Sequence, residues 1–124
     1  MRYLFLIYST ETGQPISADD EIRLSEQHRA LMQEAKGNGI FLGAEPLQAT
    51  STATTVRRQG AKVAVIDGPF AETKEQLAGY YLLECRDREE ALAWAARIPT
   101  GCAGREGCVE VRPLRVLSVG SSSK

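Results

Sequence analysis

The sequence has little cysteine and only one histidine, and this limits the kinds of site it can form. Its three cysteines, Cys85, Cys102 and Cys108, are odd in number, and no two have the C-x-x-C spacing. We therefore expect reduced thiols and neither a disulfide framework nor a structural zinc site. Glycine-rich phosphate loops and a G-x-S-x-G nucleophile motif are also missing from the sequence, so it predicts no nucleotide, metal or other cofactor.

No charge of one sign dominates, and no long hydrophobic run occurs. Fifteen basic residues against sixteen acidic ones give a net charge of -1, and Arg57-Arg58 is the only adjacent basic pair. This balance gives no general attraction to nucleic acid or to an anionic membrane surface. The apolar run at residues 3–8 is too short for a membrane span or a signal peptide. We therefore expect a cytoplasmic protein that binds neither nucleic acid nor membrane.

The length of 124 residues fits a single globular domain, and 43% of the residues are hydrophobic. Domains cluster near about 100–150 residues, so a chain of this size builds one core. We expect residues 1–117 to form that domain. The serine-rich end, residues 118–124, has the composition of a mobile tail.

Alternating and helical patterns of apolar residues predict six strands and two helices. Thr73 and Gln76 have the spacing of a capping box and predict a short helical turn between the fourth and fifth strands. The expected helices span about residues 18–36, capped by Ser17 or Asp19, and about residues 87–98, stopped by Pro99. The expected strands are Arg2–Tyr8, Ile40–Leu47, Thr52–Arg58, Lys62–Asp67, Tyr80–Cys85 and Cys108–Leu117.

The order of these elements predicts an α+β fold. Residues 52–67 form a β-hairpin around Gly60, and without it the order is βαββαβ, the ferredoxin-like split unit. In that topology the first and third strands lie in the middle of the sheet. These are the segments Arg2–Tyr8 and Tyr80–Cys85, which carry apolar residues on both faces.

Right-handed crossovers place both helices on one face of this sheet. The other face would then expose apolar residues such as Leu4, Leu6 or Tyr81. A patch of that kind on a monomer usually marks an interaction surface, and a two-fold copy of the same sheet is its simplest cover. The sequence therefore predicts a homodimer.

Two residues are candidates for acid–base chemistry. His28 lies between Leu24 and Leu31 on the helix stripe that faces the sheet, and a buried imidazole without a partner costs about 1–3 kcal/mol. An acid on the sheet is a natural partner for it, although a structural histidine at the edge of the core explains the position as well. Asp67 begins the turn Asp67-Gly68-Pro69, where it both starts the turn and is presented at a strand end.

Three further charged residues are candidates for contacts with a substrate. Glu45 lies among small and apolar residues at a strand end, where it either faces a pocket or caps a backbone amide. Lys74 and Arg57 could bind an anionic group, such as a carboxylate or phenolate. Solvated surface charge is the more usual explanation for both.

The segment Asp67-Gly68-Pro69-Phe70-Ala71-Glu72-Thr73-Lys74-Glu75-Gln76-Leu77 closely resembles the signature of DGPF-domain proteins, which belong to the wider YCII-related family. Other parts of the chain resemble the same family, and together they cover roughly residues 2–117. These parts are Tyr3–Tyr8, Gly43–Leu47, Ala93–Pro99 and Val109–Pro113.

The resemblance implies a dimeric α/β-barrel of ferredoxin-like subunits and a cleft with a histidine–aspartate acid/base pair. The family pattern around its histidine is similar to Glu26-Gln27-His28, so the resemblance places the pair on His28 and Asp67. The wider family includes an enzyme that dehalogenates a chlorinated hydroxyhydroquinone. Some DGPF proteins accompany or are fused to sigma factors, which implies a regulatory role instead.

Two hypotheses for function follow from these observations. The first is a small cofactor-independent enzyme that moves a proton on a small organic substrate, with lyase-like or isomerase-like chemistry. In it His28 and Asp67 are catalytic, and Glu45, Lys74 and Arg57 contact the substrate. The alternative is a non-catalytic ligand-binding or protein-interaction module, serving transcriptional regulation.

Overall fold

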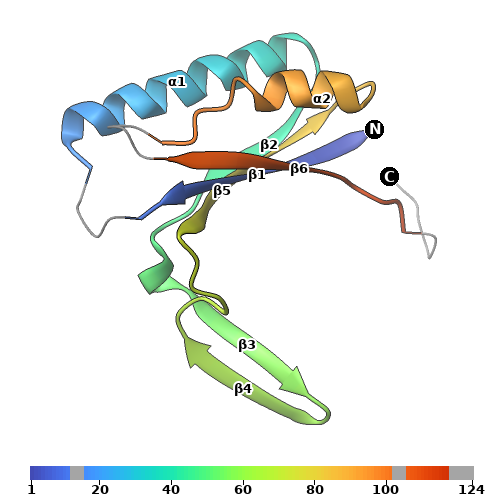
Figure 1. Cartoon of the computed structure of the whole chain (residues 1–124). Helices are drawn as coiled ribbons and strands as arrows, with labels where there is room; N and C mark the ends of the chain where they lie inside the picture. The colour runs from blue at the N-terminus through green and yellow to red at the C-terminus, as the bar shows by residue number, and fades with distance from the viewer. Residues whose placement is uncertain (12–15, 102–105, 118–124) are drawn as a thin grey trace.

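The computed structural model describes residues 1–11, 16–101 and 106–117 (Figure 1). Four strands form one antiparallel sheet with the spatial order β2-β5-β1-β6, and two strands form a separate hairpin, β3-β4. The strands are β1 (Arg2–Thr10), β2 (Phe41–Pro46), β3 (Thr54–Gln59), β4 (Lys62–Asp67), β5 (Glu75–Glu84) and β6 (Gly107–Pro113). The helices are α1 (Ala18–Gly37), α2 (Arg88–Ala95) and the short 3-10 turn η1 (Thr50–Thr52).

The prediction that the first and third strands of the βαββαβ unit are central is confirmed. Strand β1 pairs with both β5 and β6, while β2 lies at the outer edge of β5. This α+β arrangement is consistent with a ferredoxin-like fold. The hairpin is inserted between β2 and β5, as the sequence indicated.

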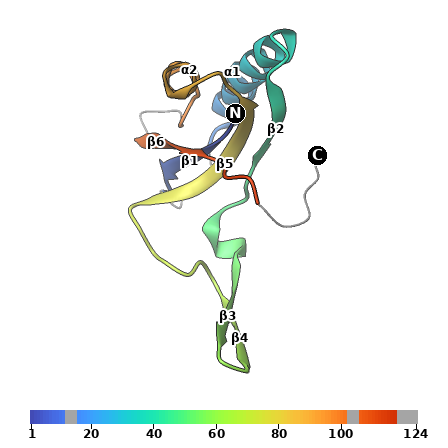
Figure 2. The same cartoon turned by 90° about the vertical axis from the view of Figure 1, so that its right-hand side faces the viewer.

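Both helices cover the same face of the four-stranded sheet (Figures 1 and 2). Helix α1 begins where the Ser17 side chain accepts a hydrogen bond from the amide of Asp20, and α2 begins where Asp87 accepts from the amide of Glu90. Such caps satisfy amide groups that have no partner inside the helix. Helix α1 contacts β2 and α2 contacts β6, so each helix lies over an outer strand.

The core lies between these helices and the sheet. Phe5 on β1, Leu83 on β5 and Ala91 on α2 are almost fully buried. Strands β1 and β5, helices α1 and α2 and the residues that follow β5 and α2 supply this cluster, and apolar residues of the outer strands β2 and β6 pack at its edge. The buried residues are Tyr3, Phe5, Ile7, Leu31, Ala35, Tyr81, Leu83, Cys85, Ala91, Trp94 and Ile98.

The helical turn expected at Thr73–Gln76 is wrong, because β5 begins at Glu75 and residues 68–74, between β4 and β5, contain no helix. The Thr73 hydroxyl donates to the backbone carbonyl of Glu75, and the side-chain amide of Gln76 donates to the backbone carbonyl of Thr73. Pairing with β1 explains the difference, since Thr10 lies opposite Glu75 and Ser9 opposite Gln76. A continued ladder satisfies these backbone groups better than one isolated helical turn.

The face of the sheet that the helices leave bare is called the open face here. Antiparallel partners share a face, so Leu4 and Leu82 lie together on it, as do Leu6 and Tyr80. All four are half-buried although no helix covers them. Tyr81 was expected on this face, and that expectation is wrong: it pairs with Phe5 on the helix side and is only 3% exposed.

No helix in the described parts of the chain combines the length and the apolar character that crossing a bilayer requires. The predicted tail at residues 118–124 lies outside the described residues, as does the middle of the loop before β6.

Gly79 leaves no room for a side chain between β5 and β2. The pairing of β1 with β5 shifts register between Ile7 and Tyr8, so that Gly79 lies opposite Ile7 and Leu77 opposite Tyr8. A Cβ on Gly79 would lie 2.9 Å from the backbone oxygen of Glu45. That contact is closer than van der Waals packing allows, so β2 would have to move.

We expect Gly79→Ala to lower the free energy of unfolding by about 1–3 kcal/mol, the usual cost of overpacking. Gly37→Ala is the matched control, because a Cβ there meets nothing within 4 Å. It lies in the last helical position of α1, where alanine is favoured over glycine. Urea denaturation measures both variants. Equal denaturation midpoints for the two variants would contradict the prediction, because β2 would then accommodate the added Cβ without loss of stability.

Candidate functional site

A pocket of about 420 Å³ opens between α1, the ends of β1, β2 and β5, and residues 99–101 that follow α2. This volume is enough for a small organic molecule. Its wall is largely apolar, and it includes five hydroxyl-bearing residues and two carboxylate residues. The lining residues are Ile7, Ser9, Ile16, Glu21, Leu24, Ser25, His28, Met32, Ala44, Glu45, Pro46, Ala78, Gly79, Tyr80, Tyr81, Pro99, Thr100 and Gly101.

His28 and Tyr81 form the polar centre of this pocket. The Nδ1 atom of His28 lies 2.7 Å from the hydroxyl oxygen of Tyr81, with the ring centroids 5.8 Å apart. Helix α1 presents His28 from the turn between Leu24 and Leu31, and β5 presents Tyr81 from beneath. The imidazole therefore has a partner, as predicted, but that partner is a phenol and not the expected acid.

Burial controls the protonation of both groups. Removal from water lowers the pKa of His28 below its usual 6.5, because the charged imidazolium is disfavoured. Burial also raises the pKa of Tyr81 to about 12, because the phenolate is disfavoured. Both side chains are therefore neutral at pH 7. The hydrogen bond at Nδ1 can form in either neutral tautomer: the Tyr81 hydroxyl donates to an unprotonated Nδ1, or Nδ1–H donates to the Tyr81 oxygen and leaves Nε2 unprotonated.

Glu45 contributes to the wall of the pocket, but its register directs the side chain elsewhere. It lies opposite Tyr80 in the β2–β5 ladder, so its Cβ is on the open face. Tyr81 and Gly79 lie on the helix face with His28. The predicted contact between Glu45 and a substrate in this pocket stays a prediction.

Asp67 and Arg57 lie on the hairpin and not in the wall of the pocket. Asp67 is exposed at the end of β4, opposite Thr54, and Arg57 is exposed opposite Ala64. Among the described residues no hydrogen bond or ion pair joins Asp67 to His28. The structure thus brings His28 together with Tyr81, and the catalytic pairing of His28 with Asp67 stays a prediction.

Lys74 lies in the connection between the hairpin and β5. Its Nζ atom is 3.5 Å from a carboxylate oxygen of Glu106, and both side chains are more than 70% exposed. An exposed pair of this kind contributes little to stability. Lys74 is not part of the pocket wall described above, so its role in anion binding also stays a prediction.

Tyr81 is the residue of the site that sequence reasoning missed. Tyr80 and Tyr81 are adjacent, so one faces the helices and the other the open face, and composition does not distinguish them. Counting in steps of two from Leu83 and Cys85 is the signal that would have placed Tyr81 in the core, since all three are buried on one face.

Comparisons with known proteins agree on the family. The model of the YCII-related domain matches residues 1–118 of this chain. An uncharacterised protein of Rhizobium meliloti (strain 1021) is 34% identical over 121 residues, which is 97% of each chain.

The lowered pKa of His28 predicts a specific pH response. The chain has one histidine, so a protein without a histidine tag gives a single imidazole Hε1 signal by proton NMR. We expect that signal to titrate with a midpoint below 6.5. The unfolded chain then binds more protons than the folded one as the pH falls below 6.5. Stability due to neutral His28 is therefore present above pH 6.5 and is lost as the pH falls through the folded-state pKa.

His28→Gln should flatten this part of the stability profile between pH 7.5 and 5.5, measured by urea denaturation at each pH. A midpoint at or above 6.5 in the wild type would contradict the burial of the imidazole.

Proposed function

The chain belongs to the YCII-related family, and we propose that its pocket binds a small organic substrate on which His28 moves a proton without a cofactor. The observation that carries this proposal is the neutral His28–Tyr81 pair, which lies in the wall of an apolar pocket of about 420 Å³. Apolar walls with a few converging polar groups are typical of binding sites for small organic molecules. Lyase-like or isomerase-like chemistry fits such a site.

In this proposal His28 acts as the base in its neutral form. In the tautomer with a proton on Nδ1, this N–H donates to the Tyr81 oxygen and Nε2 is the basic nitrogen, so the same hydrogen bond persists when Nε2 takes up a proton. The phenol keeps its own proton throughout, because its pKa is about 12. A positioned base whose pKa lies near or below neutrality is available at pH 7 without prior deprotonation.

The remaining predicted residues take secondary roles in the proposal. Asp67 is the carboxylate that the DGPF-type signature associates with the histidine, and Asp67→Asn tests whether it supports the imidazole. Glu45, Lys74 and Arg57 would contact polar groups of a substrate larger than the pocket itself.

A non-catalytic module is the second candidate, and one observation favours it. The hydrogen-bond partner of His28 is a neutral phenol, which stabilises an imidazolium less than a carboxylate would. A binding domain of this fold would keep the pocket and the dimer, and regulation in association with a sigma factor would need no acid–base pair.

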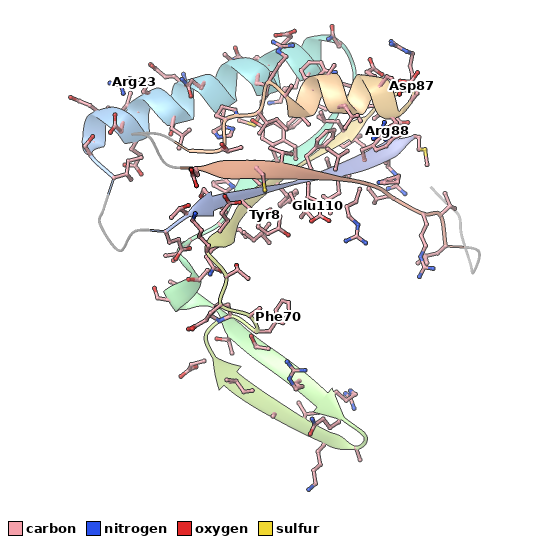
Figure 3. The ribbon with its side chains drawn as sticks, viewed as in Figure 1. Tyr8, Arg23, Phe70, Asp87, Arg88 and Glu110 are labelled. Atoms are coloured by element: carbon pink, nitrogen blue, oxygen red, sulfur yellow. The ribbon has the colours of Figure 1, made fainter. Side chains whose placement is uncertain are left out.

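We also propose that two copies pack through their open faces, forming a dimeric α/β-barrel. Leu4, Leu6, Tyr80 and Leu82 support this, since they bring apolar side chains together on the face that neither α1 nor α2 covers. Tyr8 and Glu110 lie at the side of this surface, and the tyrosine hydroxyl donates to the carboxylate at 3.4 Å (Figure 3). An apolar centre with polar groups around it is the usual anatomy of an interface.

A screen of small aromatic and carbonyl compounds that finds turnover tests the enzyme proposal. We expect His28→Gln to lower kcat/KM by about 10²–10⁴-fold, the usual contribution of a positioned base. Tyr81→Phe should lower it roughly tenfold, because one hydrogen bond to the imidazole is lost. Tyr8→Phe is the matched control, since Tyr8 lies on the other face of the sheet, and it should leave turnover unchanged.

Turnover that survives His28→Gln would remove His28 from the mechanism. Ligands that bind in the pocket with no turnover would favour the non-catalytic module.

Light scattering coupled to size-exclusion chromatography tests the open-face dimer. We expect the wild type to have the mass of two chains at micromolar concentration and Leu82→Asp to have the mass of one. A buried unpaired carboxylate at the centre of an interface costs several kcal/mol, more than enough to separate a micromolar dimer. A wild-type monomer at these concentrations would contradict the proposal.

A further inference from the structure

The hairpin formed by residues 54–67 extends away from the rest of the chain and is called the arm here (Figures 1 and 2). Every residue of β4 is exposed, and so is every residue of β3 except Thr55. A two-stranded hairpin without cover is at best marginally stable in water. The arm is nevertheless well formed along its length, with six paired positions on each strand.

One face of the arm is apolar. Val56 lies opposite Val65 and Val63 opposite Arg58, and these residues share a face because antiparallel partners do. All three valines are exposed: Val56 to 64%, Val65 to 68% and Val63 to 51%. Water-facing strands usually place polar residues at such positions, so this valine face is suited to burial against a protein surface.

The position of the arm indicates what covers the valine face. Both views show the helices on one side of the four-stranded sheet and the arm on the other (Figures 1 and 2). A second copy seated on the open face would therefore lie beside the arm. One occupant then buries the open face and the valine face together.

Charge favours a second copy as that occupant. The tip of the arm carries Arg57, Arg58 and Lys62, and no carboxylate occurs between residues 54 and 66. The register places Glu45 and Glu110 on the open face. Among the described residues Glu45 has no ion pair. Glu110 already has Arg112 beside it at 3.8 Å, so Glu45 is the carboxylate of one copy that the basic tip of another can pair with.

We propose that the arm binds a second copy of the chain. Its valine face packs against that copy, and its basic tip lies near that copy's carboxylates. This rests on the open-face dimer proposed above and adds a second contact to it. Two-fold symmetry makes the contact reciprocal, so each copy supplies one arm. Asp67 shares the valine face and is then held at the interface, whereas Arg57 lies on the opposite face of the arm, near its tip.

The dissociation constant of the dimer, from sedimentation equilibrium, tests the arm. We expect Val65→Asp to raise it at least tenfold, and the double variant Arg57→Glu with Arg58→Glu to raise it and to remove its dependence on salt. Ile22→Asp and Arg29→Glu are the matched controls. Both residues are exposed on α1, and Ile22 is 58% exposed, so neither change should alter the constant.

The outcomes separate the arm from the open-face dimer. A constant unchanged in both arm variants, with Leu82→Asp monomeric, would overturn the arm and leave the open-face dimer standing. A wild-type monomer would overturn both proposals. This holds even if a different protein is then found to cover the arm. The far-ultraviolet circular dichroism of each variant shows that the fold is kept, and the charge-reversal variant, which replaces exposed polar side chains only, serves if Val65→Asp does not fold.

Discussion

The antiparallel pairing of β1 with β5 is the constraint on which the rest of the structure depends. It places Phe5 opposite Tyr81 and Leu4 opposite Leu82, and thereby decides which side chains meet the helices and which meet the open face. A slip of one residue would exchange the two sets. Tyr81 would then leave His28, and Leu82 would enter the core in its place. The pocket and the bare surface are therefore two results of one register.

The local chemistry of the chain predicted the elements well where they are long and regular. The bounds of α1 were expected within one residue at its C-terminal end, because Ser17 caps its start and Gly37 and Gly39 surround its end. The hairpin followed from Gly60, which has a φ of 61° in the turn. The central place of β1 and β5 followed from apolar residues on both faces. In each case the residues that determine the element lie in the element itself or within a few residues of it.

The parts that sequence reasoning missed depend on contacts between distant segments. The start of β5 at Glu75 is set by pairing with Thr10, and this non-local ladder prevailed over the helical turn that Thr73 and Gln76 favour locally. Tyr81 was placed on the wrong face for a similar reason, since its orientation follows from its partner Phe5. His28 was correctly expected to have a polar partner, because burial of an imidazole demands one. The identity of that partner required the register.

The alternation of β5 also couples the pocket to the proposed assembly. Tyr81 and Gly79 face the helices and line the pocket, while Tyr80 and Leu82 face the surface on which a second copy would pack. Strand β2 approaches the same stretch so closely that Gly79 has no room for a side chain. Packing a partner against Tyr80 and Leu82 would fix the position of this strand, and with it the position of the Tyr81 hydroxyl beneath His28. In such a dimer the two pockets lie on the outer sides of the paired sheets, open to solvent. The position of Tyr81 in each pocket nevertheless depends on the contact between the two open faces.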